Sequence, residues 1–187
     1  MARIAPVAPE AMSPELAELL ATRPPYNIYR VLANAPTALP GFVKLAGALL
    51  TQSELDPQLR EMVILRVGAL CNSAYEMHQH LRLARHVGVS EERIRKAVRT
   101  DAPDNGDTLE DKLLAFTTSV VQTVKAPEAQ FRAVAAELSA RSVTELLMTI
   151  GTYMMVSRVL ENLEVELERD DIDIASRSYY APVQSPA

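Results

Sequence analysis

A nearly uninterrupted apolar run, MVILRVGALC over residues 62–71, constrains the fold of this chain more than any other segment. Asp56 and Pro57 precede it in the order typical of a helix N-cap followed by a proline in the first turn. Because Arg66 is the one charge in the run, the predicted helix has no polar face to turn toward water and must be buried nearly all round. Such a helix needs neighbours on every side, which favours a bundle of helices.

Helical periodicity and capping residues recur along most of the remaining sequence. Ser142 and Glu145 have the spacing of a capping box at the start of the last long helix. The absence of Trp and the presence of only three Phe, beside abundant Ala, Leu, Val and Met, also favour helices over a β-sandwich. The predicted helices cover approximately residues 13–21, 26–34, 40–50, 57–71, 74–87, 90–99, 109–124, 127–138 and 143–162.

These elements predict one all-α domain over residues 13–168. The Ala/Pro-rich residues 1–12 are expected to be flexible, and residues 169–187 form a polar C-terminal tail. Two of the predicted helices, 57–71 and 143–162, are apolar over most of their surface. A domain of this size rarely needs two such helices, so part of that surface is expected to contact another subunit.

Charge and cysteine content exclude several classes of protein. With a net charge of −5, the chain lacks the broad positive field that nucleic-acid binding requires. Cys71 is the only cysteine, so neither an intramolecular disulfide nor a CxxC redox centre is possible. The N-terminus has no apolar signal core, and polar residues interrupt the longest apolar run, 146–160. We therefore expect a cytoplasmic protein without nucleic-acid or membrane partners.

Glu76 and His80 are the strongest candidates for chemistry. They lie at positions i and i+4 of a predicted helix, on a face that otherwise continues in apolar residues. A carboxylate and an imidazole on an inward face are costly unless they are paired or used. One interpretation is a structural pair that joins two helices, and another is acid–base catalysis. A metal site that also includes Glu61 is a third interpretation, which the absence of an HExxH pattern disfavours.

Basic residues around this segment allow two interpretations. Arg66 either pairs with a nearby carboxylate or contributes to a polar pocket with Glu61, Glu76 and His80. Residues 82–99 hold six Arg and Lys against two Glu. That segment is either a solvated face or a positive region that steers an anionic substrate toward the helix of His80.

Residues 55–98 resemble the carboxymuconolactone decarboxylase family, which shares a fold with the alkylhydroperoxidase D proteins. The resemblance rests on Arg60-Glu61 at the start of a buried helix, on Glu76-x-x-x-His80, and on Ala84-x-x-x-Gly88-Val89-Ser90. It implies an all-α bundle that assembles into a trimer or hexamer, or alternatively a dimer. It also implies a pocket near a subunit interface, between the helices of Glu61 and His80.

The family has two chemical branches, and the residues here favour one of them. The hydroperoxidase branch carries a glutamate, a CxxC motif and a histidine four residues after the second cysteine. In this chain Ser73 and Glu76 stand at the two cysteine positions, and Cys71 is at neither. The decarboxylase branch has a glutamate where Glu76 stands and a histidine where His80 stands.

The decarboxylase branch implies a cofactor-free and metal-free reaction, either decarboxylation or proton transfer on a small carboxylated lactone or enolisable acid. In this hypothesis His80 donates the proton, Glu76 orients it, and Glu61 holds or polarises the substrate. Arg66, Arg82 and Tyr75 would bind the anionic substrate. A hydroperoxidase and a non-enzymatic oligomeric binding protein are the alternative functions.

Overall fold

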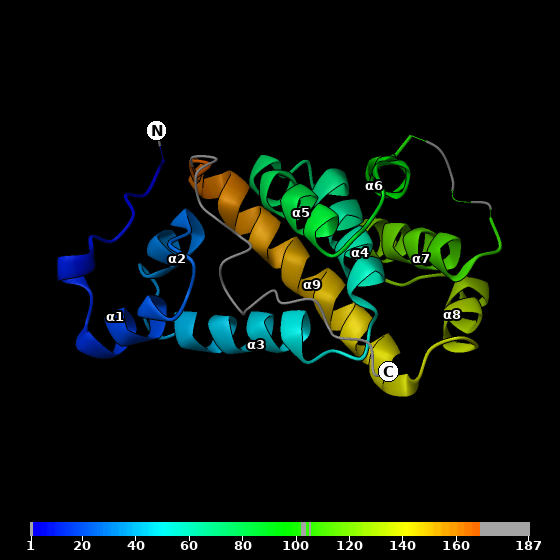
Figure 1. Ribbon diagram of the computed structural model, residues 1–187, viewed down its shortest axis with the longest axis horizontal. Coiled ribbons are helices and arrows are strands. Elements are labelled where there is room, and N and C mark those ends of the chain that lie inside the picture. Colours follow the sequence, from blue (N-terminus) through cyan, green and yellow to red (C-terminus); the bar gives the residue numbers. More distant parts are fainter. Residues whose placement is uncertain (1, 102–103, 105, 169–187) are drawn as a thin grey trace.

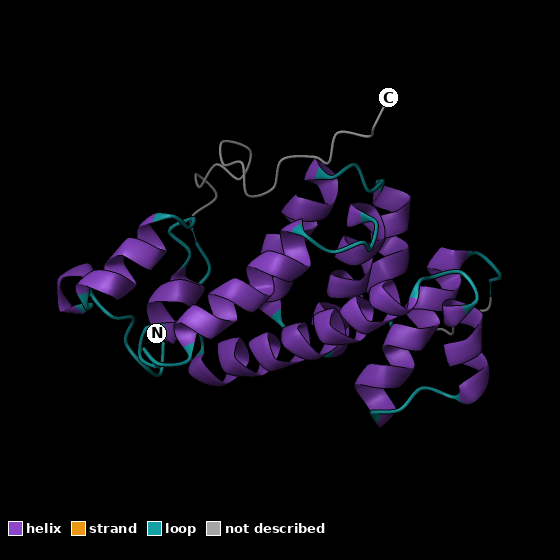
Figure 2. Cartoon of the chain, turned by 90° about the horizontal axis from the view of Figure 1, so that it is seen from below, coloured by secondary structure: helices purple, strands orange, loops and turns teal. Residues whose placement is uncertain are grey.

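The computed structural model describes residues 2–101, 104 and 106–168, and within this part of the chain the regular structure is helical, without strands (Figures 1 and 2). The predicted tail, 169–187, lies outside the described residues. The all-α fold predicted from the sequence is confirmed. A short 3-10 helix, Pro9–Ala11, precedes the helices α1 (Pro14–Ala21), α2 (Asn27–Leu32), α3 (Leu39–Thr51), α4 (Pro57–Leu70), α5 (Ala74–His86), α6 (Glu91–Val98), α7 (Leu109–Thr123), α8 (Glu128–Ala135) and α9 (Ala140–Leu163).

Helix α4 lies at the centre of the bundle, in contact with α5, α6, α7 and α9. Asp56 caps it by accepting hydrogen bonds from the backbone N–H groups of Gln58 and Leu59. Every residue from Arg60 to Gly68 is buried, as the apolar run predicts. Because α4 has no exposed face over this stretch, its charged side chains must find partners inside the protein.

Two tight turns fix α5 beside α4. Asn72, with a φ of 51°, lies in the left-handed region between the two helices, where asparagine is tolerated better than most residues. Gly88, with a φ of 89°, follows the C-terminus of α5, as expected for a glycine beyond a helix end. The turn at Asn72 brings α5 back along α4, so residues near the start of α4 face residues in the middle of α5.

Helix α9 begins one turn earlier than the capping box predicts. Ser139, not Ser142, is the N-cap and accepts a hydrogen bond from the backbone N–H of Ser142. Glu145 instead accepts from Ser53 Oγ and from the backbone N–H of Glu54, both at 2.8 Å. A glutamate engaged with the segment before α4 is not available to close a capping box. By length and hydropathy α9 could cross a membrane, but half of its most apolar stretch is buried as a core helix of the bundle.

The N-terminal segment, which was expected to be flexible, makes regular contacts with the rest of the chain. The backbone N–H of Arg3 donates to the carbonyl of Leu163, and that of Val7 donates to the carbonyl of Arg30. The side chain of Arg3 also pairs with Glu164 at 2.7 Å. These bonds are formed mainly by backbone groups, so no side-chain pattern in the sequence predicts them. Helices α1–α3 extend to one side of the bundle, with α3 alongside α9 (Figure 1).

Candidate active site

Glu61 and His80 form the centre of the site. Glu61 comes from the first turns of α4 and His80 from the middle of α5, and both are buried. His80 Nδ1 lies 2.7 Å from Glu61 Oε2, a distance typical of a charge-assisted hydrogen bond. Arg60 Nε lies 3.6 Å from the other oxygen of Glu61. The Glu61 carboxylate therefore fixes the orientation of the imidazole and is itself balanced by a cation.

Glu76 faces the other nitrogen of the same ring. Its Oε2 atom lies 3.5 Å from His80 Nε2. This oxygen is buried and makes no hydrogen bond within the described part of the chain. The sequence assigned the orienting role to Glu76, but the hydrogen-bond geometry gives that role to Glu61. Glu76 instead stands beside the nitrogen of His80 that is free to exchange a proton.

The pKa values of His80 and Glu76 are both raised above their ordinary values. Burial alone would lower the pKa of His80, but the carboxylates of Glu61 and Glu76 outweigh it and hold this pKa above its usual value. Burial raises the pKa of Glu76 to about 7, with His80 acting in the opposite direction and Glu61 adding to the rise. The pKa of Glu76 therefore lies in the pH range in which a general acid or base is effective.

A third carboxylate, Glu168, connects the C-terminal segment to the site. The Tyr75 hydroxyl and the Gln79 amide both donate to Glu168, and the backbone N–H of Asn27 donates to it as well. The same Tyr75 hydroxyl accepts from the backbone N–H of Ile28 at 3.2 Å. Burial and the neighbouring Glu168 charge raise the pKa of Tyr75, so this side chain is a neutral hydrogen-bonding group. These bonds hold α2 against α5.

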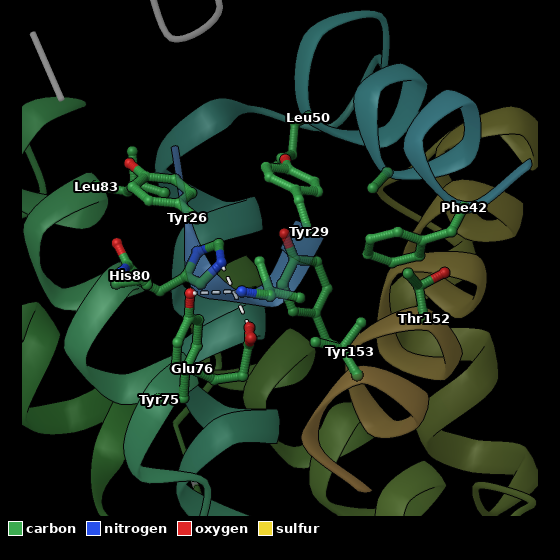
Figure 3. A pocket seen from close by; sticks show the side chains of 14 residues that line it. Tyr26, Tyr29, Phe42, Leu50, Tyr75, Glu76, His80, Leu83, Thr152 and Tyr153 are labelled. Carbon is green, nitrogen blue, oxygen red and sulfur yellow. Dashed lines mark hydrogen bonds and ion pairs between the residues drawn. The ribbon is translucent and has the colours of Figure 1, made fainter. Parts of the chain in front are cut away.

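His80 and Glu76 line a pocket of about 60 Å³, and Glu61 lies behind them. Figure 3 shows the rings of Tyr29, Tyr153 and Phe42 around the space beside the imidazole. The ring of Tyr153 stands perpendicular to that of His80, with 4.9 Å between centroids. Neither Lys nor Arg is among the fourteen lining residues: Tyr26, Ile28, Tyr29, Phe42, Ala46, Leu50, Tyr75, Glu76, Gln79, His80, Leu83, Thr152, Tyr153 and Val156.

Arg66 was predicted to bind the substrate, but it does not line the pocket, and its guanidinium is engaged in other bonds. Its guanidinium pairs with Asp104 at 2.7 Å and donates to the carbonyls of Lys96 and Ala97 and to the hydroxyl of Thr118. These bonds stabilise the end of α6 and the loop that follows it. The geometry agrees with the alternative in which Arg66 pairs with a nearby carboxylate.

The remaining candidates are only partly at the site. Tyr75 lines the pocket, whereas Arg82, a half-buried residue of α5, does not. Cys71 lines a different depression, between the end of α4 and residues 157–162. The described residues contain no group of three or more His, Cys, Asp or Glu arranged to hold a metal ion.

Sequence reasoning missed several residues of the site. Gln79 precedes His80 directly, but nothing in its spacing marks it. Glu168 is one of three glutamates in the alternating segment 163–168, and the alternation does not identify which of them is buried. The aromatic residues of α2 and α3 come from a region that the sequence motif does not include.

Comparisons with known proteins agree with this architecture. The sequence profile of the carboxymuconolactone decarboxylase family matches residues 36–119, which contain Glu61, Glu76 and His80. No curated protein matches the chain.

Three solved structures show the same fold. A peroxidase-related protein from Ralstonia eutropha JMP134, described as an alkylhydroperoxidase AhpD core, is 16% identical with a TM-score of 0.76, over 89% of this chain and 92% of that chain. The debrominase Bmp8, solved as a cysteine-to-alanine variant with 2,3,4-tribromopyrrole, is 14% identical with a TM-score of 0.72, over 90% and 94%. A protein of unknown function from Agrobacterium tumefaciens with a suggested AhpD assignment is 19% identical with a TM-score of 0.66, over 74% and 96%.

The matched segment and the shared helical architecture lead to the same conclusion as the residues of α4 and α5. Residues 36–119 of this chain match the carboxymuconolactone decarboxylase family, and the chain has an alkylhydroperoxidase D-like fold.

Proposed function

We propose that the protein is a cofactor-free acid–base enzyme that moves a proton to or from carbon in a small enolisable molecule. The observation that carries this proposal is the arrangement of His80 between two buried carboxylates. Glu61 fixes Nδ1 at 2.7 Å, and Nε2 is left facing Glu76 and the pocket. An oriented imidazole with a raised pKa can donate a proton and take it back.

In this mechanism Glu61 is a positioning residue, because it does not line the pocket. His80 is the group that exchanges a proton with the substrate carbon. Glu76, with a pKa of about 7, accepts or returns the proton at Nε2. Gln79 also lines this pocket, and its Oε1 atom, which has no hydrogen-bond partner in the described residues, can accept a hydrogen bond from an enol hydroxyl. These roles of Glu61 and Glu76 replace the earlier hypothesis, in which Glu76 orients His80 and Glu61 holds or polarises the substrate.

The charges around the pocket favour an uncharged substrate over the carboxylated one that the sequence suggested. Glu76 is a lining residue, Glu61 and Glu168 lie directly behind the wall, and no lining residue is a cation. A substrate carboxylate buried here would lack a partner, which is unfavourable in a site of low polarity. Small neutral ketones and unsaturated lactones carry an acidic C–H bond without a charge. The bound 2,3,4-tribromopyrrole of the debrominase is also a small ring without a carboxylate.

Thiol chemistry of the hydroperoxidase type has little support at this pocket. None of the fourteen lining residues is a cysteine. Cys71 lines a separate depression with residues of α7 and α9. Peroxide reduction of that type would require cysteine thiolates at the positions where Ser73 and Glu76 stand.

Hydrogen–deuterium exchange tests the proposal directly. The protein is incubated in D₂O with a panel of small ketones and butenolides, and loss of the acidic C–H signal is followed by NMR. His80→Gln is expected to lower the exchange rate by about 10²- to 10⁴-fold. His86→Gln, on the same helix but outside the pocket, serves as the control and is expected to retain the wild-type rate. Absence of exchange above buffer with every compound, or full activity of His80→Gln, would refute the proposal.

We also propose that the protein is a homo-oligomer. Leu147 and Met148 are exposed along α9, and a side chain added at Gly151 would meet open space. Exposed apolar side chains beside a glycine suit close packing against the same helix of a second copy. Leu147→Glu is expected to reduce the molar mass measured by light scattering, and Glu137→Gln, at an exposed site on another element, is the control. A monomeric wild-type protein at micromolar concentration would contradict this assembly.

A further inference from the structure

A second cavity adjoins the catalytic pocket. It measures about 210 Å³ and lies between α2, α3 and α9. Three residues, Ile28, Phe42 and Val156, line both cavities. We call the larger cavity the apolar chamber, and its other lining residues are Leu32, Ala35, Ala38, Leu39, Met155 and Val159.

The two cavities differ in chemistry. The pocket beside His80 presents a carboxyl group, an amide and two hydroxyl-bearing rings on the side of α5 and α9. The apolar chamber is lined only by aliphatic side chains, one methionine and one phenylalanine. Water is poorly accommodated in a chamber without polar groups, since a buried water needs two to four hydrogen-bond partners.

The volumes of the two cavities indicate which part of a substrate each cavity could hold. About 60 Å³ beside His80 has room for a carbonyl and its neighbouring carbon but not for a larger molecule. About 210 Å³ exceeds the roughly 150 Å³ of an apolar cavity that admits benzene. Phe42 stands at the junction, on the far side of Tyr153 from His80 in the view of Figure 3.

We infer that the apolar chamber is a binding subsite for the non-reacting, uncharged hydrocarbon part of the substrate. The substrate class is then an amphipathic molecule: a small enolisable head at His80 and an aliphatic or aromatic body of about benzene size beyond Phe42. This inference rests on the proposed proton-transfer function for the head, whereas the binding of the body depends on the chamber alone. Ile28, Phe42 and Val156 would contribute to specificity because they line both cavities.

A chain-length series of methyl ketones distinguishes the two parts. Acetone, 2-pentanone and 2-heptanone have the same reacting head and an apolar body of increasing length. Each methylene that enters the chamber is expected to tighten binding about fourfold. Binding is measured by the shift of the Met155 methyl signal in protein labelled with ¹³C-methyl methionine, assigned by Met155→Leu. Exchange of the ketone protons is measured in parallel.

Val159→Phe narrows the chamber without touching the pocket beside His80. It is expected to abolish the gain in affinity with chain length, and Leu32→Phe should do the same from the opposite wall. Ala135→Phe adds the same ring at an exposed position of α8, outside both cavities, and is expected to leave the series unchanged. Circular dichroism confirms that each variant is folded.

The outcomes separate the inference from the proposed function. Ketone binding that tightens with chain length, without any exchange, supports the chamber and refutes proton transfer. Exchange with no dependence of affinity on chain length refutes the chamber and keeps the proton-transfer function. A Met155 shift that follows protein concentration rather than ketone concentration shows that a second copy fills the chamber, and this also overturns the inference.

Discussion

The buried pair of Arg66 and Asp104 provides the sharpest quantitative test of the structure. Asp104→Ala removes two hydrogen bonds, at 2.7 and 3.2 Å, from a guanidinium that is almost wholly buried in the middle of α4. Because α4 is enclosed on all sides, the cation cannot turn toward water. Removal of one partner of a buried ion pair costs about 3–5 kcal/mol.

This cost is large against a total stability of about 5–15 kcal/mol for a typical domain. For a chain of this length it corresponds to a fall in Tm of about 6–20 °C. Urea unfolding followed by circular dichroism measures the free energy, and a thermal scan measures Tm. Asp107→Ala, at an exposed site in the same loop, is the control and is expected to change stability by less than about 0.5 kcal/mol.

A double-mutant cycle completes the test. Arg66→Met removes the other partner, and the double variant with Asp104→Ala is expected to lose less than the two single losses combined, because neither charge is then left alone. Additive losses, or an Asp104→Ala loss below about 1 kcal/mol, would refute the reasoning. If Arg66→Met kept full stability but lost ketone exchange, Arg66 would have to be assigned to substrate binding instead.

Three further predictions concern the site itself. Glu61→Gln removes the carboxylate charge that raises the His80 pKa, so NMR titration should show a lower His80 pKa and the pH profile of exchange should move to lower pH. Glu76 has a folded-state pKa of about 7 against an ordinary 4.5. Its contribution to stability is therefore complete below about pH 4.5 and is lost as the pH rises through 7. Glu76→Gln should flatten this dependence of the unfolding free energy on pH, measured between about pH 4 and 8. Tyr75→Phe leaves the buried Glu168 carboxylate short of a donor and should cost about 1–3 kcal/mol in thermal unfolding, while an unchanged Tm would contradict the role assigned to that bond.

The fold was predictable because its main constraint is local. The run from Met62 to Cys71 allows one solution, a helix enclosed by others, and the caps at Asp56 and Gly88 mark where the elements begin and end. The N-cap of α9 was placed wrongly because Ser139 and Ser142 are equally good caps. Only the engagement of Glu145 with the segment before α4 decides between them.

The spacing in the sequence singled out Glu76 and His80, but it did not predict which groups surround the imidazole. The i, i+4 spacing of Glu76 and His80 suggested a tight pair, yet the shorter contact of the imidazole is to Glu61, 19 residues away. That contact depends on how the turn at Asn72 places α5 against α4. The partner of Arg66 is 38 residues away in a loop, beyond the reach of any periodicity. Long-range pairing of charges is a property of tertiary packing, and a single sequence does not encode it in its spacing.

The bonds made by Glu168 have a consequence for biosynthesis. A ribosome releases the chain from its N-terminus, so α4 and α5 emerge and can pack long before residue 168 is synthesised. Until then the Tyr75 hydroxyl and the Gln79 amide lack their carboxylate acceptor, and α2 lacks one of the bonds that hold it over the pocket. The nascent protein therefore cannot close this wall of the pocket until α9 and the segment that follows it have been synthesised.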